Sequence, residues 1–83
     1  MSQVSLEIAT RLEDAGFPRP ESADYVFQPT IADILRELPD FSLKAVPNAA
    51  GFFCYRLDPA MYKWSSNAAD ACALAWLAEN EKK

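Results

Sequence analysis

The side chains of this chain that could do chemistry are few, and the chain contains no histidine. Asp33 and Glu37 stand four residues apart, so on a helix they would share one face and could hold a divalent cation. Cys54 and Cys72 are candidate nucleophiles. Carboxylates at this spacing more often line a solvated helix face, and neither cysteine has the neighbouring base that activates a thiol. We therefore interpret the chain as a non-enzyme without metal or cofactor, with a metal- or thiol-dependent enzyme as an alternative.

The cysteines and the apolar runs bear on the compartment. Two cysteines without histidine are too few for a structural zinc site. The first residues reach Glu7 and Arg11 before any long apolar stretch, unlike a signal peptide. The longest apolar run, 71–78, is far shorter than the ~20 residues that cross a bilayer. We expect a cytoplasmic protein that avoids membranes and keeps its cysteines as buried thiols rather than as a disulfide.

Charge is distributed unevenly along the chain. The net charge is −4, and residues 1–40 hold eight acidic residues against three arginines. This sign disfavours general binding to a phosphate backbone. Lys44, Arg56 and Lys63 nevertheless lie among aromatic residues, which is the mixture that binds single-stranded nucleic acid. Nucleic acid is the less favoured alternative partner.

Hydrophobic periodicity predicts one α+β domain over residues 1–83. Gly16 is placed to end the first helix, and Thr30 with Asp33 resembles a capping box at the start of the second. Three helices should pack on one face of a small two- or three-stranded antiparallel sheet, in the order α-α-β-β-(β)-α. The expected helices cover 2–15, 29–38 and the run 68–78; the expected strands cover 41–46, 52–57 and, if a third forms, 61–64.

The last helix is apolar almost all round. From Ala68 to Ala78 it carries one charge, Asp70. Such a helix must be enclosed on more than one side, by the rest of the chain or by a second chain. Trp76 either caps the edge of the core or marks the contact of a homodimer, for which a sheet edge is the other route.

The sheet offers the best candidate for a binding surface. We expect Phe53, Tyr55 and Leu57 to face the core. The side chains then pointing away are Ser42, Lys44, Val46, Phe52, Cys54 and Arg56. Aromatic residues mixed with basic ones are enriched at protein interfaces, although an ordinary sheet face is the simpler alternative. The candidate partner-binding residues are Lys44, Phe52, Arg56, Trp64 and Trp76.

Several segments together resemble a group of short bacterial proteins encoded in prophages and mobile elements. These are LEDAGF (12–17), PTIADILREL (29–38), the pair FSLKAV and FFCYRL, and NAADACALAWLAE (67–79). The group has no assigned activity. In it an aromatic and an acidic residue accompany the alanine-rich helix, and Trp76 and Glu79 correspond to them without a known role. The resemblance implies a small accessory protein that acts by contact with a protein partner or with itself.

Overall fold

The computed structural model describes residues 3–18, 27–46, 50–58 and 60–80. It confirms the α+β fold and the element order, and the third strand does form. The strands make one antiparallel sheet in the order β1-β2-β3. The elements are α1 (Leu6–Asp14), α2 (Ile31–Arg36), β1 (Ser42–Val46), β2 (Gly51–Leu57), β3 (Ala60–Ser65) and α3 (Ala68–Asn80).

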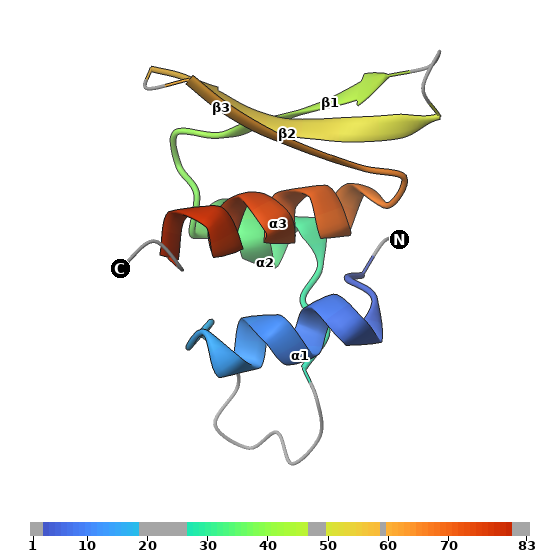
Figure 1. Cartoon of the computed structure of the whole chain (residues 1–83), viewed down its shortest axis with the longest axis vertical. Helices are drawn as coiled ribbons and strands as arrows, with labels where there is room; N and C mark the ends of the chain where they lie inside the picture. Colours follow the sequence, from blue (N-terminus) through green and yellow to red (C-terminus); the bar gives the residue numbers. More distant parts are fainter. Residues whose placement is uncertain (1–2, 19–26, 47–49, 59, 81–83) are drawn as a thin grey trace.

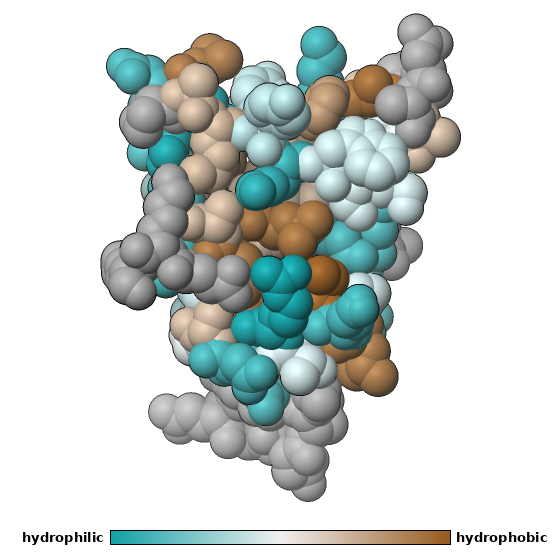
Figure 2. Space-filling model, in the orientation of Figure 1, coloured by the Kyte–Doolittle hydropathy of each residue, from teal (hydrophilic) through white to brown (hydrophobic). Residues whose placement is uncertain are grey.

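The helices lie on one side of the sheet, as predicted, but at different depths. Figure 1 shows α3 against the sheet, α2 behind it, and α1 on the far side of α3 from the sheet. Helix α3 contacts each of the other five elements. Figure 2, in the same orientation, shows apolar side chains gathered at the level of α3 with polar ones around them. The core of the domain is therefore built around α3.

Burial along α3 confirms that an all-apolar helix needs cover on several sides. Eight of its residues are buried, and its one charged residue in the first turn, Asp70, accepts a hydrogen bond from the Ser5 backbone N–H at 2.7 Å. The helix begins after Asn67, whose side-chain oxygen accepts from the Ala69 N–H at 2.9 Å. The buried residues are Ala68, Ala69, Ala71, Cys72, Ala73, Ala75, Trp76 and Leu77.

Of the two alternatives for Trp76, the structure agrees with the one that places its side chain at the core of the single chain. Trp76 is 6% exposed and lies edge to face against Phe17. Gly16, at φ +87°, ends α1 as predicted, and the Phe17 N–H then bonds back to the Leu12 carbonyl at 2.9 Å. This reversal of the chain brings the Phe17 ring onto α3.

Helix α1 begins later than its apolar spacing predicts. Ser5 is its N-cap and accepts from the Ile8 N–H, while Gln3 and Val4 are outside the helix and pair with the segment before α2. Leu6, the first residue of the helix, is exposed although it is apolar. The predicted start at Ser2 lies outside the described residues.

Helix α2 follows its predicted cap closely. The Thr30 side chain accepts from the Asp33 N–H, and the Asp33 carboxylate accepts from the Thr30 N–H, which completes a capping box. Asp33 also forms an ion pair with Arg36 at 3.6 Å. The carboxylate considered as a metal ligand therefore has a structural role here.

The predicted orientation of β2 is reversed. Cys54 is fully buried, Phe52 packs against the core, and Arg56 reaches α3. Phe53, Tyr55 and Leu57 therefore point away from the helices, since side chains alternate along a strand. Both alternating sets of β2 are largely apolar or aromatic, so periodicity alone could not decide which set faces the core.

Candidate contact surface on the outer face of the sheet

The side of the sheet turned away from α3 carries most of the aromatic residues of the strands. We call this side the outer face. Cross-strand partners point to the same side, so the pairing of Phe53 with Lys44 and Trp64 places all three together. The row of Ser42, Tyr55 and Tyr62 lies beside them. The outer face thus comprises Ser42, Lys44, Phe53, Tyr55, Leu57, Tyr62 and Trp64.

A shallow depression occupies the middle of the outer face. Its volume is about 400 Å³, and Lys44, Phe53, Tyr55 and Tyr62 line it. The rings of Phe53 and Tyr62 meet edge to face, with centroids 5.3 Å apart and planes inclined by 89°. Tyr62 is 67% exposed, so its ring is open to a partner while one edge is already supported.

Trp64 is positioned by a glycine on the neighbouring strand. A Cβ atom at Gly51 would overlap the Trp64 indole, so the ring lies directly on the bare backbone. Gly51 is buried in consequence, whereas Trp64 remains 43% exposed. The absence of a side chain at one strand position thus fixes an aromatic side chain on the outer face.

Lys44 gives the depression its charge. No acidic side chain is among the residues lining the depression. Within the described part of the chain, no carboxylate forms an ion pair with Lys44. The depression is therefore aromatic and locally positive on a protein whose net charge is −4.

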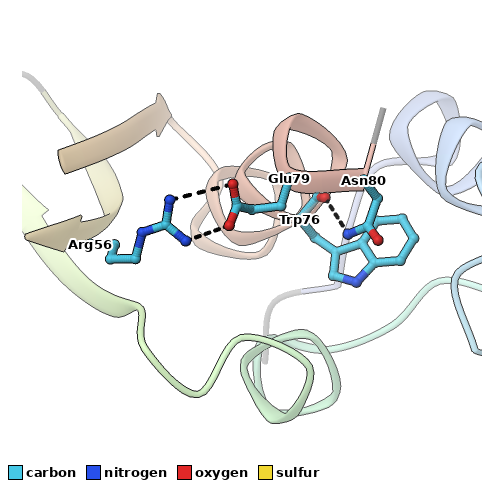
Figure 3. Close-up of polar contacts among 4 residues, drawn as sticks. All are labelled: Arg56, Trp76, Glu79 and Asn80. Carbon is cyan, nitrogen blue, oxygen red and sulfur yellow. Dashed lines mark hydrogen bonds and ion pairs between the residues drawn. The ribbon is translucent and has the colours of Figure 1, made fainter. Parts of the chain in front are cut away.

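Arg56, predicted to bind a partner, instead joins the sheet to α3. Its guanidinium pairs with both carboxylate oxygens of Glu79, one at 3.4 Å, as Figure 3 shows. The guanidinium carbon also lies 4.9 Å from the centre of the Phe41 ring. A bidentate ion pair of this kind fixes direction as well as distance. The resemblance drew attention to Glu79 but assigned it no role; in the structure its carboxylate pairs with Arg56.

The last turn of α3 is held by a second polar contact. In Figure 3 the side-chain amide of Asn80 donates to the Trp76 carbonyl, at 2.8 Å. The bond ties the end of the helix to the residue whose ring contacts Phe17. Trp76 thus lies inside the core and offers no surface to a partner.

The structure therefore separates the five predicted partner-binding residues. Lys44 and Trp64 lie on the outer face; Phe52 and Arg56 face the helices, and Trp76 is in the core. The three basic residues of the nucleic-acid alternative are not brought together either, because Lys63 pairs with buried Cys54 and so belongs to the helix side.

Sequence reasoning missed the outward placement of Phe53, Tyr55 and Tyr62. Tyr55 and Tyr62 carried a usable signal, since a phenol combines an apolar ring with a hydroxyl that water or a partner must satisfy. Phe53 carried no comparable signal. Its position follows only from the burial of its neighbour Cys54.

Two further findings bear on the class of protein. None of the described helices has the length and apolar character needed to span a membrane. Among the described residues, no three potential cysteine or carboxylate ligands cluster as a metal site would require.

No protein-family model matches the chain, and no match was found among the curated proteins or the solved structures.

Proposed function

We propose that this protein is a non-catalytic binding protein whose contact surface is the outer face of the sheet. Its partner is a peptide segment of another protein that carries a carboxylate beside an aromatic or aliphatic side chain. One observation carries the proposal: an open aromatic depression in which Lys44 is the charged lining residue.

The side chains of the outer face suit binding because they are already partly immobilised. Tyr62 is supported by Phe53, and Trp64 by the backbone of Gly51. Rigid aromatic rings contribute contact area at a small cost in side-chain entropy. Tyrosine and tryptophan are also the residues that most often dominate binding energy.

Charge complementarity selects the chemistry of the partner. Lys44 would pair with a carboxylate from the partner, while the rings around it accept apolar side chains. A second copy of this chain fits less well, because the outer face as defined contains no acidic residue to meet Lys44. Single-stranded nucleic acid fits less well too, since one lysine offsets little backbone repulsion from a protein of net charge −4.

The test is selection from a random-peptide display library on the purified full chain. The peptides enriched should share an acidic residue flanked by apolar ones. A parallel selection on Lys44→Glu should lose the acidic preference, because the charge of the depression is reversed. Peptides that lack an acidic residue, or that are enriched equally on both proteins, would overturn the proposal.

A second arm of the experiment addresses nucleic acid. Labelled oligothymidylate should show no binding at about 150 mM salt. Binding that persists at that salt and is lost in Lys44→Glu would replace the peptide proposal with the nucleic-acid alternative. The cytoplasmic location and the role as a prophage-associated accessory protein belong to the same proposal and rest on the sequence.

A further inference from the structure

A second depression adjoins the aromatic one, and Tyr55 lines both. It has a volume of about 370 Å³ and lies at the end of the sheet where β1 begins and β2 ends (Figure 1). Its lining residues are Asp40, Ser42, Tyr55, Arg56, Leu57 and Asp58. A ligand that lies across Tyr55 can therefore occupy both depressions at once.

The two depressions carry opposite charges. Lys44 is the charged residue of the aromatic depression, whereas two exposed aspartates, Asp40 and Asp58, line the second one. Arg56 lines it as well, but its guanidinium is paired with the Glu79 carboxylate. Neither aspartate forms an ion pair with another residue that the structure describes. The second depression is therefore negative, and we call it the acidic depression.

We propose that the partner peptide carries a basic residue as well as an acidic one, and that the acidic depression binds the basic side chain while Lys44 binds the carboxylate. This inference rests on the proposed function and deepens it by defining the second charge of the partner. Opposite charges at two fixed points specify how a peptide lies on the surface, which a single ion pair cannot do.

Strand geometry sets the spacing of the two charges in the peptide. Lys44 pairs with Phe53, and Asp58 follows Phe53 by five positions, or about 17 Å at the rise of a β-strand. Asp40 precedes Lys44 by four positions, which is about 13 Å in an extended chain. An extended peptide covers the same distances with about four or five residues. The basic residue should therefore stand about four or five positions from the acidic one.

The shape of the acidic depression favours a peptide over a second copy of this chain. Tyr55 and Arg56 are consecutive in β2 and so point to opposite sides of the sheet, yet both line the depression. The depression therefore continues from the outer face around the end of the sheet. An extended peptide can follow that path, whereas the sheet of a second copy, laid on the outer face, would leave part of it unfilled.

The test compares the peptides that a random-peptide display library yields on variants of the full chain. On the wild type, enriched peptides should carry an acidic and a basic residue about four or five positions apart. The double variant Asp40→Asn with Asp58→Asn should keep the acidic preference and lose the basic one, whereas Lys44→Glu should lose the acidic preference and keep the basic one. Asp14→Asn is the matched control and should select as the wild type does, since Asp14 is an exposed carboxylate on α1, across α3 from the sheet.

Isothermal titration calorimetry with one enriched peptide measures the contact itself. The double variant should bind about fivefold more weakly, at the upper end of what exposed ion pairs contribute, and this loss should shrink at about 0.5 M salt. Replacing the basic residue of the peptide with glutamine should weaken its binding to the wild type by the same factor. The glutamine peptide should bind the double variant and the wild type equally, because the contact is already lost.

The outcomes separate this inference from the proposed function. Acidic peptides without a basic preference, or equal affinities for the wild type and the double variant, would overturn the inference and leave the proposed function in place. Peptides without an acidic residue would overturn both. Should the double variant fail to fold, the glutamine peptide decides: unchanged affinity for the wild type would contradict the inference.

Sedimentation velocity of the chain without peptide tests the other occupant. We expect the wild type and the double variant to be monomers alike. A wild-type dimer that dissociates in the double variant would show that a second copy, rather than a peptide, fills the acidic depression.

Discussion

The ring of Phe17 meets the indole of Trp76 edge to face, with centroids 5.0 Å apart and planes inclined by 78°. The contact covers the side of α3 that the sheet does not reach. With the sheet, α1 and α2 around it, an apolar helix is enclosed within one chain of 83 residues. The protein therefore needs no second copy to bury this helix.

Removing the indole should strongly destabilise the fold. Trp76→Ala leaves a cavity against Phe17, and the expected loss in the free energy of unfolding is about 3 kcal/mol. Phe17→Ala should also lower the free energy of unfolding. This loss should be about 1 kcal/mol smaller in the Trp76→Ala background than in the wild type, because the aromatic contact is already gone. Urea denaturation of the two single variants and the double variant measures both values. Additive losses would show that the two rings are not coupled.

The enclosure of Trp76 also bears on the oligomeric state. We expect a monomer in sedimentation velocity at high micromolar concentration, because the residue proposed to mediate a homodimer is 6% exposed. A stable dimer would contradict this expectation. Its contact would then be expected at the edge strands of the sheet, β1 and β3.

The ion pair between Arg56 and Glu79 should contribute to stability. Glu79→Gln keeps the shape of the side chain but removes its charge, and we expect a loss of about 1 kcal/mol, because the pair is half-buried and bidentate. Arg36→Gln is the matched control, because its ion pair with Asp33 is largely exposed. The control should cost less than about 0.5 kcal/mol. Equal losses in the two variants would show that partial burial and bidentate geometry do not strengthen the Arg56–Glu79 ion pair.

A methyl group at Gly51 should displace Trp64. Gly51→Ala places a Cβ atom into the indole, so we expect destabilisation together with a red-shifted tryptophan emission as the ring moves into water. Adding Trp64→Ala should restore most of the stability. Gly16→Ala is the control: it costs about 1 kcal/mol through its positive φ, with no ring to displace. A Gly51→Ala protein that Trp64→Ala does not rescue would contradict the steric account.

Local signals in the sequence predicted local structure well. The capping box of Thr30 and Asp33 and the turn at Gly16 were predictable because the groups involved are close in sequence. The start of α1 was not, because Val4 continues the apolar spacing of the helix but is buried by pairing with Pro29. That pairing is a tertiary contact, which periodicity cannot anticipate.

The candidate surface was only partly predictable. Lys44 and Trp64 were correctly associated with an exposed sheet face, but the two sides of β2 were exchanged. Phe52 and Phe53 are identical side chains at adjacent positions, so the strand itself contains no information on which one faces the helices. The packing of α3 on β2 decides it, by enclosing Cys54 in the core.

Binding of a selected acidic peptide to Tyr62→Ala tests the central claim most directly. Tyr62 is 67% exposed, so its removal should leave the fold intact. Leu6→Ala is the matched control, since Leu6 is 60% exposed on α1, across α3 from the sheet. Isothermal titration calorimetry should give a Kd at least about tenfold weaker for Tyr62→Ala and an unchanged Kd for Leu6→Ala. An unchanged Kd for Tyr62→Ala, or a weaker one for Leu6→Ala, would contradict the assignment of the outer face as the contact surface.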